Sequence, residues 1–264
     1  MKLLWIPVLF ATCSWAQFPE PDGGNLRPGT LPSVWITGGP NCLEVPDFQV
    51  HEYNPDLFIL RESGCIHYEK PFLYLFFGSE KALLYDTGAG AAPTGRVVAE
   101  LMAKWMKRAA REMPMPLVVA HSHAHGDHTA GDAQLKALPN TTVIGTDVTS
   151  VQKFFGFQNW PKDIVKFDLG GRVLDVIAIP GHETSSIAIY DRQTGILLTG
   201  VRSIQEGCTY AMRRHSRPVL NGWWNSPRTS RWPICWELTL SRAPRRSWTT
   251  KSGPPINPMS TAWS

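Results

Sequence analysis

The stretch HSHAHGDH at positions 121–128 constrains this chain more than any other. It holds four of the chain's 8 histidines, and it follows directly on PLVVA, an apolar run with the character of a buried strand. Side chains two residues apart leave the same face of an extended segment, so His123 and His125 share a face. The glycine that follows lets the backbone turn sharply and brings Asp127 and His128 toward the same point. The fold must therefore end a buried strand in a cluster of imidazoles and one carboxylate.

The side-chain types in this cluster indicate which ions it can bind. Imidazole and carboxylate together favour zinc, iron or manganese over magnesium and calcium. An imidazole-rich site with an open coordination position is how Zn²⁺ generates hydroxide from water at neutral pH. A solvated histidine-rich loop or a nonspecific metal-binding tract is the alternative, but it explains neither the spacing nor the preceding strand. The sequence therefore predicts a metal site.

Up to about residue 200 the chain alternates strand-like and helical segments. FQVHEY, DLFILRES, FLYLFFGS and KALLYDTG have strand character with short turns between them, which predicts an antiparallel or mixed sheet. Residues 95–112 place apolar side chains at helical spacing, and Met113-Pro114 ends this amphipathic helix. There follow a short helix near 131–138, a helical turn after Asp147, and the strand-like runs TTVIGT, RVLDVIAIP, SIAIYD and GILLTG. The pattern predicts one layered α/β domain over residues 42–200.

Four segments together resemble the metallo-β-lactamase superfamily. The H-x-H-x-D-H motif at positions 123–128 is the signature of that family. LLYDTGAG is similar to its strand ending in an Asp-Thr-Gly turn, here at Asp86, and AIPGHETSS is similar to the segment that supplies a later metal-binding histidine, here His182. GILLTG is similar to the strand that runs into a bridging aspartate. The resemblance covers about residues 45–200 and implies an αβ/βα sandwich with a dinuclear metal site at one edge.

Carried over position by position, the resemblance assigns roles to particular side chains. His123, His125 and His182 would hold the first metal, Asp127 and His128 would hold the second, and Asp86 would accept a hydrogen bond that fixes a ligand imidazole. The implied cofactor is zinc, as one or two ions, with iron or manganese as alternatives. Three other histidines, at positions 51, 67 and 215, fit no motif.

The implied chemistry is hydrolysis of a small-molecule substrate. A hydroxide attacks a carbonyl or ester carbon while the metals polarise the substrate oxygen, and Asp127 orients the nucleophile or takes its proton. An ester, a thioester, a lactam and a phosphodiester are all open as the bond that is cut, because substrate contacts lie in loops and in the C-terminal part. The resemblance thus predicts a metal-dependent hydrolase.

The first residues, MKLLWIPVLFATCSWA, predict a signal peptide over 1–16. Lys2 precedes an apolar run, and Ser14 and Ala16 are the small pair expected before a signal-peptidase cut near Ala16. The run is shorter than the roughly 20 residues of a membrane-spanning helix, and no later segment supplies one. A lipoprotein signal through Cys13 is the weaker alternative, because Thr12 is larger than the residue usual at that place. The mature chain is therefore expected to be secreted or periplasmic.

Residues 17–41 are rich in proline and glycine, as in FPEPDGGNLRPGTLP, and predict an extended arm rather than part of the core. Cys42 and Cys65 follow this arm. In an exported domain two such cysteines can form a disulfide, and a pair of buried free thiols is the alternative.

The character of the chain changes at Val201. Residues 1–200 carry a net charge of −4 and residues 201–264 a net charge of +8, and the second stretch holds six of the 11 tryptophans and no aspartate. This tail lacks the periodic apolar pattern of a folded domain and is expected to be disordered. An arm for nucleic acid or a membrane surface is the other interpretation, but the tryptophan and proline content and the expected export argue against a nucleic-acid partner.

The departure from the family falls at the same place. The family has an aspartate directly after LLTG and a further histidine near the C-terminus, whereas here Val201 takes the first position and His215 has no matching context. Joining the third base of each tail codon to the first two of the next permits GRLYV at 205–210, GTHIE at 236–241 and YQPDEH at 255–261, all like downstream segments of the family. We therefore expect a frameshifted C-terminus. The alternative to an active hydrolase is then an inactive or mononuclear metal-binding remnant.

Overall fold

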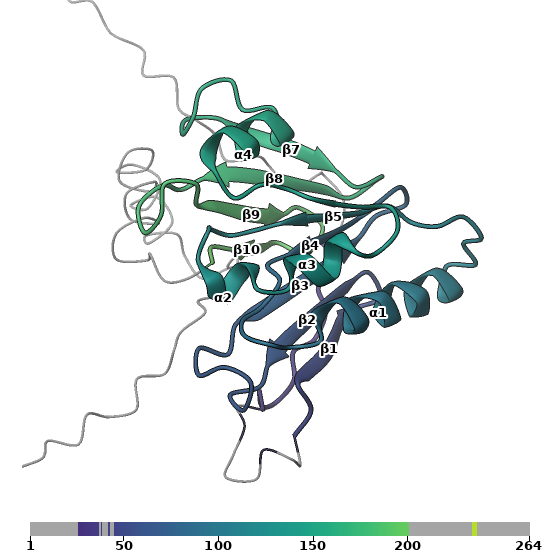
Figure 1. Ribbon diagram of the computed structural model, residues 1–264. Coiled ribbons are helices and arrows are strands. Elements are labelled where there is room, and N and C mark those ends of the chain that lie inside the picture. The colour runs from purple at the N-terminus through teal and green to yellow at the C-terminus, as the bar shows by residue number, and fades with distance from the viewer. Residues whose placement is uncertain (1–25, 37, 39–41, 43–44, 201–233, 237–264) are drawn as a thin grey trace, which may run out of the picture.

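Two β-sheets make up most of the computed structural model, which describes residues 26–36, 38, 42, 45–200 and 234–236 (Figure 1). The first sheet has the strand order β1-β2-β3-β4-β5-β6 and the second β11-β10-β9-β8-β7. The first consists of β1 (Phe48–Asn54), β2 (Leu57–Glu62), β3 (Phe72–Phe77), β4 (Ala82–Tyr85), β5 (Leu117–Ala120) and β6 (Thr141–Val143). The second consists of β7 (Ile164–Asp168), β8 (Val173–Ala178), β9 (Ile187–Asp191), β10 (Ile196–Leu198) and β11 (Ile234–Trp236).

The first sheet is mixed, in agreement with the sequence pattern. β1 to β4 pair antiparallel with their neighbours, whereas β5 and β6 run parallel to β4. Parallel neighbours need a crossover connection, and the amphipathic helix α1 (Thr94–Arg108) lies in the connection between β4 and β5. As a result, β4 and β5 end at the same edge of the sheet.

Helix α1 packs on one face of the first sheet (Figure 1). Its buried Val98, Leu101 and Trp105 share an apolar cluster with the strands and with Leu135 of helix α3 (Asp132–Lys136). The helix ends at Arg108, earlier than the predicted end at residue 112, and Ala110 just beyond it has a φ of +49° that breaks the helical path. Two further helices are α2 (Gly126–Thr129) and α4 (Val148–Phe155).

A second apolar cluster fills the space between the two sheets. Alternate residues of each strand point into it, as the two-residue period of a strand requires, including Ile59, Phe76 and Leu83 from the first sheet and Leu174, Val176 and Ile189 from the second. At one edge the Tyr85 hydroxyl donates a hydrogen bond of 2.7 Å to the carbonyl of Ile187. The two sheets are therefore held together beside the point where β4 ends.

A buried arginine joins the sheets at the other end of the strands. Arg172 forms an ion pair of 2.6 Å with Asp191 of β9, and both side chains are almost fully buried. The same guanidinium donates to the backbone carbonyls of Asp56 and Phe77 in the first sheet. Because a buried charge is costly unless it is paired and hydrogen-bonded, these contacts specify how the sheets face each other.

The described part of the N-terminal arm, residues 26–36, contacts both sheets. The backbone N–H of Arg27 donates to the carbonyl of Gln193, which precedes β10. Leu31 and Trp35 pack against the cluster between the sheets. These residues of the arm therefore contribute apolar side chains to the core.

Cys42 and Cys65 form a disulfide, which settles the pairing that the sequence leaves open. The bridge connects the end of the arm to the loop between β2 and β3. This loop lies near the turn after β4, since a Cβ atom added at Gly90 would lie 3.5 Å from Ile66 Cγ2.

The predicted layered α/β fold is confirmed in the described part of the chain. The strand-like runs of the sequence each contain a strand, and the short edge strand β7, whose residues alternate between exposed and half-buried, is one that the sequence patterns do not predict. The predicted disorder and frameshift of residues 201–264 lie outside the described residues, apart from β11, which pairs parallel with β10. Among the described residues, no helix is both long and apolar enough to cross a membrane.

Candidate metal centre

The predicted site residues come from loops at one edge of the two sheets. Asp86 follows β4 directly, and the histidine cluster follows β5, which runs parallel to β4. His182 lies in the loop between β8 and β9 of the second sheet. The histidine cluster and His182 therefore come from opposite sheets, and the packing of the sheets brings them together.

The structure gathers the five predicted metal ligands into two groups that share one histidine. In the first group, donor atoms of His123, His125 and His182 lie within 4.8 Å of one another, and in the second, donor atoms of His123, Asp127 and His128 do. Within the first group, His182 Nε2 lies 3.1 Å from His125 Nδ1. Each group has the number and type of ligands that zinc sites use.

Two buried nitrogen atoms in these groups have no hydrogen-bond partner in the described part of the chain. They are the Nε2 atoms of His123 and His128, whose side chains are almost fully buried. His128 Nε2 lies 3.0 Å from Asp127 Oδ2 without making a hydrogen bond of acceptable angle. Buried polar atoms are nearly always satisfied, so unpartnered nitrogens that converge on a carboxylate fit a bound cation. The residues present therefore fit a metal ion.

The other ring nitrogens of the two buried histidines are held in place. His128 Nδ1 donates to Asp86 Oδ2 at 2.8 Å, and the second oxygen of Asp86 accepts the backbone N–H of Ser122 at 2.6 Å. The Ser122 hydroxyl lies 3.0 Å from His123 Nδ1 and 3.2 Å from His128 Nδ1. These bonds leave Nε2 as the nitrogen that faces the site, which is how carboxylates usually orient metal-binding imidazoles.

Burial and neighbouring charges give the two buried histidines, His123 and His128, different pKa values. Burial and the neighbouring charge of His128 lower the pKa of His123 to about 4, so this imidazole is neutral and free to bind a metal. Burial also lowers the pKa of His128, but the carboxylates of Asp86 and Asp127 outweigh it and raise the value to about 10. A metal that binds His128 Nε2 therefore displaces a proton.

The charge of Asp127 is fixed by the same neighbour. Burial raises its pKa, but the interactions with the neighbouring His128 are stronger, and the net effect is a pKa far below the usual value for aspartate. Asp127 lies in the first turn of α2, next to the unpartnered nitrogens. It is therefore an ionised carboxylate directed at the place where an ion would bind.

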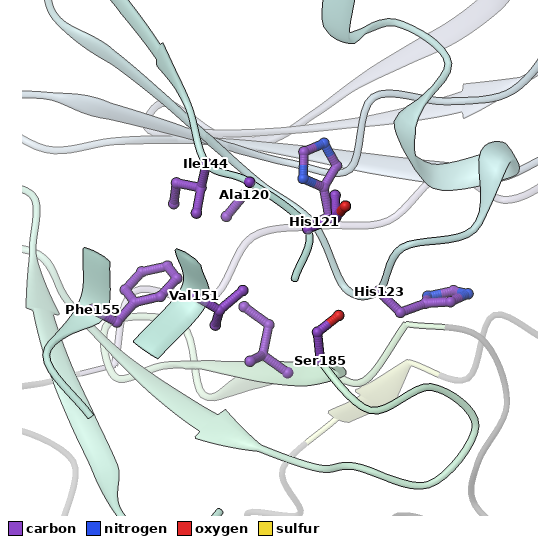
Figure 2. A pocket seen from close by; sticks show the side chains of 10 residues that line it. Ala120, His121, His123, Ile144, Val151, Phe155 and Ser185 are labelled. Atoms are coloured by element: carbon purple, nitrogen blue, oxygen red, sulfur yellow. The ribbon is translucent and has the colours of Figure 1, made fainter. Parts of the chain in front are cut away.

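The fourth histidine of the cluster does not join the metal groups. His121 extends away from His123 (Figure 2), and its Nε2 bonds to Asp132 Oδ1 of α3 at 2.8 Å. Sequence reasoning gave His121 no role and also passed over Ser122 and Asp132. The signal for Ser122 is its place before the first ligand, but nothing in the sequence places Asp132 beside His121.

A small pocket opens beside His123. Ile144, Val151 and Phe155 line one side of it, and Ser185 lies with His123 on the other (Figure 2). The pocket therefore connects the candidate metal centre to an apolar wall formed by α4 and the loop before it.

The three histidines that fit no motif stay apart from these groups where they are described. His51 bonds through Nε2 to the carbonyl of Thr30 in the arm, and His67 lies near Glu69 in the loop after β2. His215 lies outside the described residues.

The strand β10 leads the chain back to the metal centre. Gly200, just after it, has a φ of +70°, and a Cβ atom there would lie 2.5 Å from Ser122 Cβ. Only glycine fits this contact, and it brings the backbone against the residue that bonds both buried histidines. Val201 is the next residue in the sequence and lies outside the described residues.

Residues 71–200 match the sequence model of the family described as the metallo-beta-lactamase superfamily. Among curated proteins, hydroxyacylglutathione hydrolases from Methylococcus capsulatus and Rhizobium meliloti are each 30% identical to this chain, over 90 and 87 residues. These alignments cover 34% and 33% of this chain and 35% and 34% of the relatives. The chain thus spans about a third of the length of the curated relatives it matches.

Two solved structures of metallo-beta-lactamases are similar to part of this chain. A metallo-beta-lactamase from Pontibacter korlensis is 22% identical with a TM-score of 0.39, over 57% of this chain and 69% of that one. One from Hirschia baltica is 17% identical with a TM-score of 0.41, over 58% of this chain and 70% of that one.

Proposed function

Because residues 71–200 belong to the metallo-beta-lactamase superfamily, we propose that this chain is an exported zinc-dependent hydrolase. Its substrate is a small molecule with an ester, thioester, lactam or phosphodiester bond. The observation that carries the proposal is the convergence of the unpartnered Nε2 atoms of His123 and His128 on Asp127. A hydrolase site needs such an array, whereas a structural histidine cluster would satisfy its own nitrogens.

Each residue of the centre has a part in this reaction. When bound, zinc polarises the substrate oxygen and lowers the pKa of water. His123, His125 and His182 hold the ion, and the hydrogen bond from His128 to Asp86 fixes the orientation of the second buried imidazole. The ionised carboxylate of Asp127 would orient the attacking water.

The curated relatives favour one substrate class for the first assays. Both are hydroxyacylglutathione hydrolases, and a hydroxyacylglutathione is a thioester. We therefore place thioesters ahead of esters, lactams and phosphodiesters. A panel of chromogenic substrates from these four classes, assayed with the same protein preparation, tests this order.

Export is part of the proposal and has its own support. The sequence begins with a signal-like apolar run, and Cys42 and Cys65 form a disulfide, a bond that persists mainly in oxidising compartments. We place the mature protein outside the cytoplasm, either secreted or periplasmic. N-terminal sequencing of the exported protein should begin near Gln17, whereas an intact Met1 would contradict export with cleavage.

A second candidate function rests on the sequence after β10. Val201 stands where the family has a metal-bridging aspartate, directly after the glycine that contacts Ser122. Without that carboxylate, the described residues offer Asp127 and His128 the shared His123 alone to complete their group. The chain would then bind one metal ion through His123, His125 and His182 and have little or no hydrolase activity.

Metal analysis of the purified protein tests the site. We expect wild type to bind at least one equivalent of zinc and His123→Ala, which belongs to both groups, to lose it. His51→Ala is the matched control, because His51 bonds to the arm and should leave the zinc content unchanged. If wild type binds no zinc, or if His123→Ala retains it, the proposed metal site is wrong. Zinc without turnover of any substrate in the panel would favour the second candidate.

A further inference from the structure

Glu62, the last residue of β2, is a carboxyl that the proposed chemistry does not use. Its side chain is fully buried. Oε2 accepts the backbone N–H of Ala89 at 2.8 Å, whereas Oε1 has no hydrogen-bond partner among the residues that the structure describes. Glutamate is rarely buried without a paired charge, and each unsatisfied buried polar atom calls for an explanation. The hydrogen bond from Ala89 is therefore the contact through which this carboxyl can act.

Ala89 belongs to the turn after β4, which is bonded to the candidate metal centre on its other side. Asp86, at the start of the turn, accepts from His128 Nδ1. The N–H of Thr87 donates to the carbonyl of His128 at 2.8 Å, and the carbonyl of Gly88 accepts from Ala130 at 3.1 Å. The turn therefore lies between Glu62 and helix α2, and a shift on one side is transmitted to the other.

The contact between Glu62 and the turn is also tight. Gly88 has a φ of +88°, and a Cβ atom at this position would lie 2.6 Å from Glu62 Oε2. The carboxyl fills the space that a side chain at Gly88 would need. The close packing of Gly88 against Glu62 fixes the distance between the turn and the end of β2.

We propose that Glu62 is a positioning residue for the metal centre, acting through the turn Asp86–Ala89 on the orientation of His128. This inference rests on the proposed metal site. Removing the acceptor leaves the buried N–H of Ala89 unsatisfied and loosens the turn that carries Asp86. Loss of a group that orients a metal ligand typically weakens metal binding by about 10- to 100-fold.

The cost of keeping a carboxyl at this place supports a specific role. Burial is the main cause that raises the pKa of Glu62 to about 7, and the nearby charges of Asp127 and Asp47 add to it. The hydrogen bond from Ala89 works in the opposite direction. An apolar residue would avoid the cost of burial but could not accept this hydrogen bond.

Two variants and one control separate positioning from general stability. Glu62→Leu removes the acceptor, and Glu62→Gln keeps one at nearly the same place. Asp191→Asn breaks a fully buried ion pair with Arg172 at the other end of the second sheet, so it destabilises the fold without touching the turn. If Glu62→Leu does not fold, Glu62→Asp, which withdraws the carboxyl by one methylene, replaces it.

Zinc affinity, measured by competition with a chromogenic chelator, is the first readout. Glu62→Leu should weaken zinc binding by about 10- to 100-fold. Glu62→Gln should restore it to within a few-fold of wild type, and Asp191→Asn should lower only the urea midpoint of unfolding. The proposal is overturned if Glu62→Leu binds zinc like wild type, or if the Gln and Leu variants are equally weak.

A readout in metal-free protein keeps this test separate from the proposed function. In protein labelled with ¹⁵N-histidine, the Nδ1 signal of His128 should change in Glu62→Leu and keep its wild-type position in Glu62→Gln. If wild type binds no zinc, the proposed function fails, but the His128 signal still decides the role of Glu62. An unchanged His128 signal in Glu62→Leu would show that Glu62 does not act through the turn.

Discussion

Three buried or half-buried carboxyl groups near the metal centre differ in charge for local reasons. Burial raises the pKa of Asp86, but the interactions with His128 outweigh it and leave the value below that of an ordinary aspartate. The interactions with His128 likewise lower the pKa of Asp127 below that of an ordinary aspartate. For Glu62, burial is the main cause that raises the pKa to about 7. The sequence shows three acidic residues, and only the packing decides which of them are ionised.

The raised pKa of Glu62 predicts a pH-dependent term in stability. Between its usual value of 4.5 and about 7, the folded chain keeps a proton that the unfolded chain releases. Rising pH therefore favours unfolding through this group, and Glu62→Gln removes the effect. In metal-free protein, we expect the free energy of unfolding of wild type to fall relative to Glu62→Gln from about pH 5 to about pH 7.5, as measured by urea denaturation. A difference that stays constant over this range would contradict the burial of a titrating carboxyl at position 62.

At the scale of elements, Trp105 anchors helix α1 to the first sheet. The Trp105 ring stacks on Phe77 at a centroid distance of 4.7 Å, and its Nε1 donates to Asp56 at 2.9 Å. This side chain is only 8% exposed. It therefore combines apolar burial with a satisfied polar atom, as a buried tryptophan requires.

We expect Trp105→Ala to lower the free energy of unfolding by about 3–5 kcal/mol, the usual cost of removing a large aromatic side chain from a core. Arg96→Ala on the exposed side of the same helix breaks only a surface pair with Glu100 and should cost less than about 0.5 kcal/mol. Chemical denaturation of both variants measures the contrast. Equal effects would show that α1 is not anchored through Trp105.

Most elements could be predicted because their sequence periods are strong. The strand character of β1 and β2 and the helical spacing in α1 fix their type. Helix α1 nevertheless ends at Arg108, before the predicted end at residue 112, because Ala110 leaves the helical path ahead of Met113-Pro114. The five ligand candidates could be predicted from motif and resemblance. Glu62 and Asp132 could not, because their roles depend on strands and helices that meet only after folding.

At the scale of the whole molecule, the proposed frameshift predicts a specific defect in the coding DNA. A single-base insertion or deletion should lie within a few codons of Gly200, and its repair should place an aspartate after the glycine and convert everything downstream to the other frame. Segments similar to GRLYV, GTHIE and YQPDEH should then appear at 205–210, 236–241 and 255–261. Sequencing the gene decides this. Stop codons throughout the shifted frame would rule the account out.

The repaired protein should also differ in metal content. A bridging carboxylate and a late histidine would return to the second group, which now consists of Asp127, His128 and the shared His123. We expect the repaired protein to bind one more equivalent of zinc than the present chain under the same conditions, as measured by metal analysis. Equal stoichiometry would mean that position 201 does not contribute to the centre.

The Cys42–Cys65 bridge affects how a thioester substrate can be studied. Hydrolysis of a thioester releases a thiol, and a thiolate attacks accessible disulfides by exchange. Cys42 is exposed, and its partner Cys65 lies in the loop that contacts the turn after β4. If the proposed thioester substrate is correct, the thiol that hydrolysis releases can attack this bridge. Turnover is best followed through the carboxylic acid, with an oxygen ester as a thiol-free reference, because slowing seen only with the thioester would report on the bridge and not on the metal.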